Sequence, residues 1–235
     1  MKILASLLVH DKKVKYLNEV IYSIKQCKGN FVLEAGCFNT ENKVIEYFKN
    51  TDTYLNIYDR PKKERSQNSY ELIYFAGMPE IELNQLSWLR NQCFKRALKY
   101  DYHLFVDSDL ILKPNTIERL VNADKDIIGG WYFNKRFSDV TVSMEGKEDE
   151  MMIKNKPFLV KTIGAGCSMI KRNVYEKNKF QEENIKLGED WQYFKNLTDK
   201  GYEVWCDPVL YCKHLGDYRN VAEKYKKEKI KKWNL

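Results

Sequence analysis

The first sixty residues alternate between apolar runs and segments with helical spacing. Residues 3–9 are apolar and predict a strand, and the apolar run 31–33 predicts a second strand ending at Glu34-Ala35-Gly36. A third strand is predicted at 54–58. Apolar side chains three or four positions apart predict helices between these strands, at Val14, Leu17, Ile21 and Ile24 and again at Val44, Ile45 and Phe48. This strand–helix–strand–helix–strand order favours parallel βαβ units.

A polar loop is expected at 60–70, followed by a helix over 87–99 whose buried side is formed by Leu86, Leu89, Cys93 and Ala97. Ser87 is a suitable N-cap for this helix. Arg90 would then lie in the first turn, where backbone N–H groups and the helix dipole favour an anion. An arginine is unfavourable for the dipole there, and a bound phosphate would account for it.

The next strand runs directly into two carboxylates. Leu104 to Val106 are apolar and β-favouring, and Asp107 and Asp109 follow where the strand leaves the sheet. Ligands of open α/β folds bind at the carboxyl ends of strands. Two such acids can hold a divalent cation beside phosphates. The alternative is a polar strand-end turn in which Asp107 caps the next helix.

The second half predicts further strands and two helices. A helix begins at Pro114, a strand covers 126–132, and the segment 138–156 is a polar insertion. Strands at 158–163 and 168–170 flank Gly164-Ala165-Gly166, which suits either a hairpin or the floor of a ligand site. Gly188-Glu189-Asp190 opens a helix that ends at Gly201. Two short strands separated by Asp207-Pro208 lead to His214.

Length and composition favour one compact domain. The chain has 235 residues, of which 43% are hydrophobic and 14% aromatic, enough for a sizeable core. Its apolar runs are too short to span a bilayer, and the apolar start is followed at once by charge, so we interpret it as a strand rather than a signal peptide. The six cysteines form no Cys-x-x-Cys pair, which favours a reducing cytosol.

These elements occur in an order that resembles the GT-A fold glycosyltransferases, in particular the inverting family-two type. Four stretches carry the resemblance, which covers roughly residues 3 to 216. They are Leu7–Ile24, Leu86-Ser87-Trp88-Leu89-Arg90-Asn91, Leu104–Asp109, and Gly188-Glu189-Asp190 with Asp207-Pro208 and His214. The resemblance implies an α/β fold with a mostly parallel sheet flanked by helices and a small antiparallel element in the C-terminal half.

The same resemblance implies a division of the chain. Residues 1–216 would form a single GT-A domain, with a nucleotide-sugar-binding half at 1–110 and an acceptor and catalytic half at 111–216. Residues 217–235 would form a basic C-terminal helix or tail, since lysines crowd this segment of a chain whose net charge is +7.

By this resemblance the protein transfers a sugar from a nucleoside-diphosphate sugar to a hydroxyl acceptor, with inversion. Asp107 and Asp109 would hold the metal and diphosphate, the metal being Mn²⁺ or Mg²⁺ and His214 a further ligand. Asp190 would be the general base with Glu189 beside it. Donor contacts would come from His10, Glu34, Arg90, Asp107 and Ser108. Acceptor contacts would come from Trp131, Gly164, Gly166 and Trp191.

Two positions depart from the family pattern. Glu34 stands where the family usually has an aspartate that binds the base, which leaves the base preference open. His10-Asp11 stands where Tyr-Asn or a similar pair is usual. The acceptor, whether a glycan, a lipid-linked sugar or a protein, is not indicated by the sequence.

Two other functions are compatible with parts of the sequence. A haloacid-dehalogenase-like phosphatase also uses Asp-x-Asp after an apolar strand, with Asp107 as the nucleophile, but its motif normally lies on the first strand. A non-catalytic basic module would bind membrane or nucleic acid through the lysine-rich tail. We expect a cytoplasmic enzyme, or one peripheral at the inner membrane surface through this tail, and no nucleic-acid partner.

Overall fold

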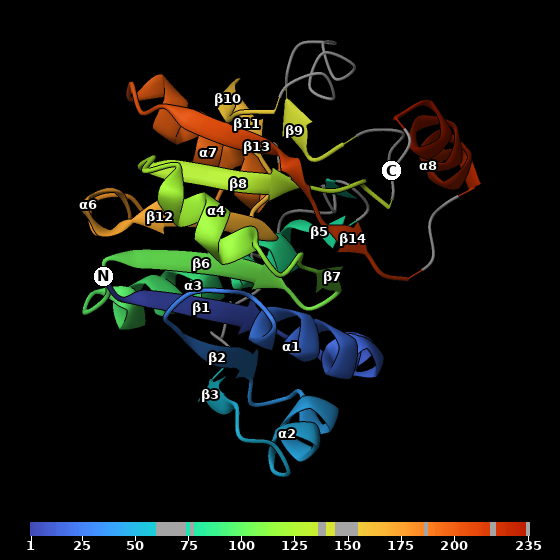
Figure 1. The fold of residues 1–235 in the computed structure, drawn as a ribbon. Coiled ribbons are helices and arrows are strands. Elements are labelled where there is room, and N and C mark those ends of the chain that lie inside the picture. The colour runs from blue at the N-terminus through green and yellow to red at the C-terminus, as the bar shows by residue number, and fades with distance from the viewer. Residues whose placement is uncertain are drawn as a thin grey trace.

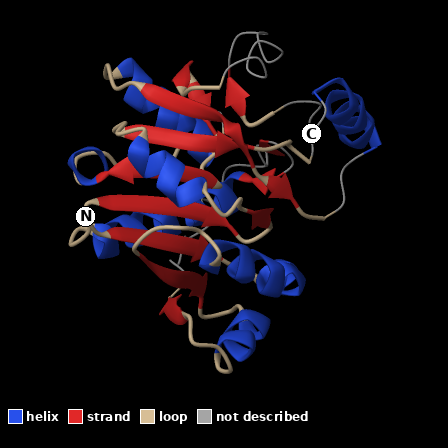
Figure 2. Cartoon of the chain, viewed as in Figure 1, coloured by secondary structure: helices blue, strands red, loops and turns tan. Residues whose placement is uncertain are grey.

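The computed structural model describes residues 1–59, 74–75, 78–135, 140–143, 155–185, 188–216 and 220–233. The loop expected at 60–70 and most of the insertion expected at 138–156 lie outside these ranges. The described chain forms three layers, with helices on both faces of a central sheet (Figures 1 and 2).

The large sheet has eight strands in the order β10-β13-β8-β12-β6-β1-β2-β3. Their bounds, in chain order, are β1 (Ile3–Leu8), β2 (Phe31–Phe38), β3 (Tyr54–Tyr58), β6 (Tyr102–Asp107), β8 (Ile127–Trp131), β10 (Phe158–Val160), β12 (Cys167–Lys171) and β13 (Val204–Tyr211). Strand β1 pairs in parallel with β2 and β6, and β2 pairs in parallel with β3. Strand β12 lies antiparallel between β6 and β8, and β10 pairs antiparallel with β13. The mostly parallel sheet with an antiparallel element is therefore confirmed.

Each face of the sheet carries its own hydrophobic core. Helices α1 (Leu17–Lys25), α2 (Asn42–Phe48) and α4 (Thr116–Asn122) contribute to one cluster. Helices α3 (Glu80–Ala97), α6 (Arg172–Tyr175) and α7 (Glu189–Asp199) contribute to the other. Strand β1 is buried on both sides because it lies between these layers, which explains why its sequence is a continuous apolar run rather than an alternating one.

Several predicted boundaries are wrong. Strand β2 continues to Phe38, so Glu34 lies inside the strand. Helix α3 begins at Glu80, so Ser87 is not its N-cap. Helix α4 begins at Thr116, two residues after Pro114. The apolar run 158–163 divides between β10 and β11 (Thr162–Ile163), which lie in different sheets.

The two short strands expected around Asp207-Pro208 are one strand, β13. Its register with β8 shifts between Cys206 and Tyr211, which accommodates the proline in an irregular segment. The Asp207 carboxylate is buried and accepts two hydrogen bonds from Arg119, at 2.9 and 3.1 Å. The Pro208 carbonyl accepts a hydrogen bond from the Trp131 indole at 2.8 Å. The dipeptide thus belongs to the framework.

Three two-stranded sheets complete the described fold. They are β11 with β9 (Val142–Ser143), β14 (Lys213–His214) with β7 (Leu110–Ile111), and β4 (Tyr74–Phe75) with β5 (Met78–Pro79). The pairing of β14 with β7 places His214 opposite Leu110, beside the two aspartates. A 3₁₀ helix, η1 (Asp11–Tyr16), follows β1, and α8 (Asn220–Trp233) ends the described chain. No helix in the described ranges is long and apolar enough to cross a bilayer.

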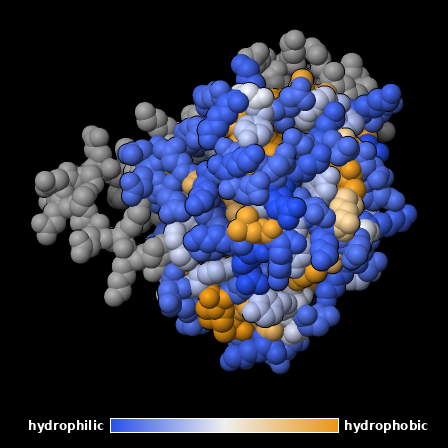
Figure 3. All heavy atoms as spheres, turned by 90° about the vertical axis from the view of Figure 1, so that its left-hand side faces the viewer, coloured by the Kyte–Doolittle hydropathy of each residue, from blue (hydrophilic) through white to orange (hydrophobic). Residues whose placement is uncertain are grey.

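The two ends of the parallel strands differ. The face at their amino ends is largely hydrophilic, with small separate apolar patches (Figure 3). At the carboxyl ends lie Asp107, η1, His214 and the loop at 164–166 (Figure 1). Polar residues from distant parts of the sequence therefore meet at the edge where ligands of parallel sheets bind.

Candidate active site at the carboxyl edge of the sheet

Asp109 is buried in a cluster of basic side chains. Its side chain is 5% exposed, and its Oδ2 contacts the ammonium groups of Lys13 and Lys135 and lies 3.2 Å from Nε2 of His214. Lys13 comes from η1, Lys135 from the segment after β8, and His214 from β14. We call Asp109, Lys13, Lys135 and His214 the Asp109 cluster. Sequence reasoning missed both lysines, although Lys13 follows the first strand.

His214 faces Asp109 with an unprotonated nitrogen. Its Nδ1 lies 2.9 Å from the Phe133 carbonyl oxygen, a group that only accepts, so this nitrogen carries the hydrogen. Burial and the charge of Lys135 lower the pKa of His214 to about 3, so the ring is neutral and Nε2 presents a lone pair. The ammonium groups of Lys13 and Lys135 supply the positive charge that two acceptors facing each other at 3.2 Å need.

The chemistry of these groups fits a divalent metal ion. Metal-binding histidines usually donate their other ring N–H to a carbonyl or carboxylate, as His214 does to Phe133. Imidazole and carboxylate together suit Mn²⁺, and carboxylate with phosphate oxygens suits Mg²⁺. Asp109 and His214 would supply two protein ligands, and a phosphorylated substrate would supply others.

Asp107 is directed elsewhere. Its Oδ1 lies 3.5 Å from an Nη atom of Arg90, its backbone N–H donates to the Gly166 carbonyl at 3.0 Å, and its side chain is 32% exposed. Within the described ranges, no group of three or more His, Cys, Asp or Glu side chains is placed to hold a metal ion. The expected set of Asp107, Asp109 and His214 is therefore not assembled as one three-residue metal site.

Arg90 joins the aspartate strand to α7. Its side chain is 3% exposed, and one Nη atom lies 3.5 Å from Asp107 and 3.3 Å from Glu189. Its guanidinium also packs over the rings of Phe105 and Phe180, at 4.9 and 5.6 Å from their centroids. Because α3 begins at Glu80, Arg90 is in mid-helix, and the argument for a phosphate contact at a helix start is wrong.

Glu189 and Asp190 begin α7 and form the Glu189–Asp190 pair. Glu189 is buried and directed to Arg90, whereas Asp190 is half-buried and accepts hydrogen bonds from the backbone N–H groups of Ala165 at 3.1 Å and Trp191 at 2.8 Å. Burial raises the pKa of both carboxyl groups, and Arg90 opposes this effect in both. Of the two, Asp190 is more accessible to an acceptor.

Tyr132 fills the space between the two carboxylate regions. Its buried hydroxyl accepts a hydrogen bond from the Gly166 backbone N–H at 3.1 Å. A Cβ at Gly166 would lie 2.5 Å from Asp107 Oδ2 and 2.6 Å from the Tyr132 hydroxyl, and Gly164 is similarly crowded by Tyr132. These two glycines are thus required by packing, and their contact with an acceptor stays a prediction.

The predicted donor contacts at His10 and Glu34 lie in different surroundings. His10 is exposed and precedes η1 at the end of β1. Glu34 is buried within β2, where it accepts hydrogen bonds from Ser6 at 3.1 Å and Arg96 at 2.9 Å. Because the strand continues for four residues beyond it, Glu34 does not reach the carboxyl edge. Its expected contact with a nucleotide base is not supported.

The carboxyl ends of β2 and β3 instead present Asn39 and Asp59, which sequence reasoning missed. Both are exposed, and the Asn39 amide donates to the Asp59 carboxylate at 2.8 Å. The misplaced end of β2 concealed Asn39, which follows that strand only when it runs to Phe38. Asp59 directly follows β3, whose predicted bounds were correct, and was overlooked.

The two tryptophans predicted to contact an acceptor differ in their exposure. Trp131 is fully buried, and its indole is hydrogen-bonded to Pro208, so the expectation that it presents a face to an acceptor is wrong. Trp191 is half-buried in the first turn of α7, beside Asp190. Ser108 is buried between the two aspartates.

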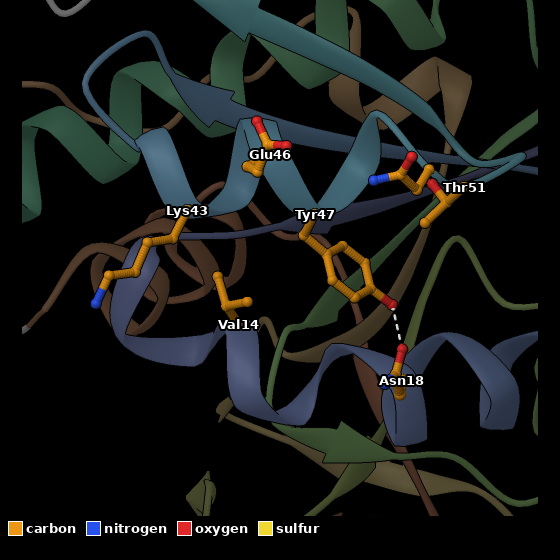
Figure 4. A pocket seen from close by; sticks show the side chains of 7 residues that line it. Val14, Asn18, Lys43, Glu46, Tyr47 and Thr51 are labelled. Carbon is orange, nitrogen blue, oxygen red and sulfur yellow. Dashed lines mark hydrogen bonds between the residues drawn. The ribbon is translucent and has the colours of Figure 1, made fainter.

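A shallow hollow of about 640 Å³ lies apart from these groups (Figure 4). It is lined by residues of η1, α1 and α2 and the turn after α2, and in it Tyr47 donates a hydrogen bond to Asn18 at 2.7 Å. Its lining includes none of the clustered carboxylates, histidine or arginine of the sheet edge. We therefore place the candidate site at the sheet edge.

Comparison with known proteins supports the fold. No protein-family model matches the sequence, and no curated protein matches it. Among solved structures, A197 from STIV is 17% identical over 92% of this chain and 87% of its own, with a TM-score of 0.51. GalNAc-T7 with UDP, GalNAc and Mn²⁺ is 12% identical over 98% of this chain, with a TM-score of 0.63. TarS from S. aureus in complex with UDP is 14% identical over 91% of this chain, with a TM-score of 0.53.

The GT-A type fold predicted from the sequence is therefore confirmed. This chain spans 48% of the GalNAc-T7 chain and 60% of the TarS chain. At such identities the likeness establishes the fold, while substrates and residue roles have to be argued from this chain.

Proposed function

We propose that this protein is a glycosyltransferase that moves a sugar from a nucleoside-diphosphate sugar to a hydroxyl acceptor, with a divalent cation at Asp109 and His214. The observation that carries the proposal is the convergence of the Asp109 cluster and the Glu189–Asp190 pair at the carboxyl edge of a GT-A type sheet. The basic Asp109 cluster suits a diphosphate, and the carboxylates of the Glu189–Asp190 pair suit removal of a proton from the acceptor hydroxyl. The bound UDP and Mn²⁺ of GalNAc-T7 agree with this assignment.

The Asp109 cluster would bind the diphosphate. Its lysines supply positive charge, while Asp109 and the neutral Nε2 of His214 supply ligands for a cation. When bound, the cation would neutralise the departing diphosphate as a Lewis acid. The nucleotide base would lie toward Asn39 and Asp59, at the ends of β2 and β3.

Asp190 would take the proton of the acceptor hydroxyl. Its two backbone N–H partners favour the ionised form, which a general base needs, and they fix the carboxylate in one orientation. Glu189 is a weaker candidate because Arg90 and the core enclose it. A single base on one side of the sugar is compatible with inversion, which we retain as part of the proposal.

The two alternatives have less support. A haloacid-dehalogenase-like phosphatase would carry its nucleophile on the first strand, whereas Asp107 ends β6 and lies near Arg90. Helix α8 exposes lysines such as Lys224 and Lys227, so contact with an anionic membrane surface stays a prediction. Salt-sensitive liposome association that disappears on deletion of residues 222–235 would support it.

The test is a ligand screen by thermal unfolding. UDP-, GDP-, CMP- and dTDP-sugars are each added with and without Mn²⁺, and we expect one nucleotide class to raise the Tm, most strongly with the metal. The corresponding sugar donor should then release its nucleoside diphosphate when a hydroxyl acceptor is supplied. If no nucleotide sugar binds, and a generic phosphomonoester is hydrolysed, the phosphatase replaces this proposal.

A further inference from the structure

The Asp109 cluster combines one carboxylate with two ammonium groups. Both ammonium groups contact the same oxygen of Asp109, and Nε2 of His214 lies 3.2 Å from that oxygen. Lys226 of α8 lies near the cluster: burial lowers its pKa most, Glu223 raises it, and the charges of Lys213 and Lys135 lower it further. Ammonium groups gathered at one part-buried point favour an anionic ligand such as a phosphate.

The two lysines also occupy the side of Asp109 that a metal ion would need. Both contact Oδ2, the oxygen that lies 3.2 Å from Nε2 of His214. Divalent cation and ammonium groups therefore compete for the same carboxylate oxygen. A metal ion can bind well only when the lysines have another partner.

Lys13 and Lys135 are placed so that they can leave Asp109 and bind another anion. They reach Asp109 from separate elements, Lys13 from η1 and Lys135 from after β8, and their side chains are 25% and 15% exposed. Both ammonium groups lie 5.9 Å from the centroid of the Tyr16 ring, which provides a second favourable contact beside the carboxylate. A long side chain with a flexible stem can move its charge from Asp109 to a nearby phosphate.

We propose that Lys13 and Lys135 hold Asp109 until a donor diphosphate binds, and that they then bind the diphosphate and leave Asp109 to the divalent cation. This inference rests on the proposed function. It makes the two lysines ligand-binding residues and couples metal binding to nucleotide binding. By linkage, each ligand then raises the affinity for the other.

The decisive variant is Lys13→Met with Lys135→Met. Without the lysines, Asp109 is left to the metal, so Mn²⁺ alone should bind about tenfold more tightly than in the wild type. Loss of the same two charges should weaken metal-free binding of UDP by about tenfold or more. Opposite changes for the two ligands are expected because the lysines exchange between the two anions.

Two measurements give the changes in Mn²⁺ and UDP affinity without an assay of sugar transfer. The electron paramagnetic resonance signal of free Mn²⁺ gives the Kd of the metal with and without UDP, and calorimetry in EDTA gives the Kd of UDP alone. Lys12→Met is the matched control for each single variant, since Lys12 is exposed on the same 3₁₀ helix and its loss removes one positive charge, as Lys13→Met or Lys135→Met does. Lys13→Arg with Lys135→Arg keeps both charges and should keep the weak metal-alone binding.

The outcomes separate this inference from the proposed function. If the double Met variant folds with an unchanged Tm and binds Mn²⁺ alone no more tightly than the wild type, the exchange is wrong. Unchanged UDP affinity in EDTA would also overturn it. Failure of the wild type to bind any nucleoside diphosphate, with or without Mn²⁺, would instead overturn the proposed function. Should the double variant unfold, Lys13→Met and Lys135→Met are measured singly against Lys12→Met.

Discussion

The Asp109 cluster and the Glu189–Asp190 pair lie at the same edge of the sheet but in opposite electrostatic surroundings. Asp109 has two lysines and a histidine around one carboxylate oxygen. Glu189 and Asp190 are two adjacent carboxylates that share the influence of one arginine, and burial raises the pKa of each. Clustered ammonium groups suit a diphosphate, and carboxylates with raised pKa suit proton transfer.

The difference shows how one edge can serve two ligands. Arg90 lies between Asp107 and the Glu189–Asp190 pair, with one Nη atom 3.5 Å from Asp107 and 3.3 Å from Glu189. It holds these carboxylates from a buried position. We therefore regard Arg90 as a positioning residue. The following predictions test this division of roles.

Replacing Asp190 should have the largest effect. Asp190→Asn keeps the size of the side chain but removes the proton acceptor, so we expect transfer to fall by about 10²- to 10⁴-fold while donor binding is retained. Transfer kinetics and nucleotide calorimetry measure the two quantities. Asp199→Asn, an exposed aspartate at the other end of α7, removes the same charge and should have little effect. A near wild-type rate in Asp190→Asn would refute the assignment of the base.

Removing Arg90 should destabilise the Glu189–Asp190 pair. Arg90→Met leaves Glu189 buried without its cation, and the free energy of unfolding should fall by about 3–5 kcal/mol. Urea unfolding measures this loss. A second change, Glu189→Gln, removes the buried charge and should recover part of the stability. A loss in Arg90→Met below about 1 kcal/mol would show that Arg90 does not stabilise the buried Glu189 as described.

Replacing Asp109 should separate metal binding from nucleotide binding. In Asp109→Asn we expect the enhancement of UDP affinity by Mn²⁺ to fall by about 10- to 100-fold. UDP affinity in EDTA should not weaken, because Lys13 and Lys135 remain and lose their competing carboxylate. Calorimetry with and without Mn²⁺ gives both values, and the exposed Asp52→Asn is the control. Equal loss of UDP affinity under both conditions would contradict the proposed separation.

The smallest predicted effect concerns how His103 makes the free energy of unfolding depend on pH. His103 is fully buried, and burial, assisted by the charge of Arg90, lowers its pKa from 6.5 to about 3. The unfolded chain then binds a proton that the folded chain excludes, so stability is lost as pH falls below 6.5 toward 3. Between about pH 7.5 and pH 5 this contribution amounts to about 2 kcal/mol.

His103→Gln should reduce this dependence on pH. Glutamine retains a donor for the Ser6 hydroxyl, which lies 2.9 Å from the histidine Nε2, but it does not titrate. The quantity to compare is the difference in free energy of unfolding between the two pH values, in wild type and variant, since costs independent of pH cancel. An unchanged difference would show that His103 does not contribute to acid sensitivity.

The sequence alone determined the fold class and the location of the two aspartates. Helical spacing and apolar runs identified β1, β6 and α1, because local burial patterns follow from the period of each element. Helix α7 was identified by the acids of its first turn and the glycine after its end. Of the predicted buried side of α3, Leu89, Cys93 and Ala97 are buried, and Leu86 is half-buried. The Asp107–Asp109 turn was identifiable because an apolar strand that ends in acids is a pattern of adjacent residues.

Only the tertiary structure decided which side chains meet. The true end of β2 follows from its pairing with β1 and β3, not from its apolar run, so the sequence placed Glu34 at the edge and missed Asn39. Trp131 was assigned to an acceptor, and its burial became evident only with its hydrogen bond to Pro208. The surroundings of Asp109 come from η1, β14 and the segment after β8. Contacts between residues about a hundred positions apart leave no local pattern, because side-chain charge and distance are set by the folded chain.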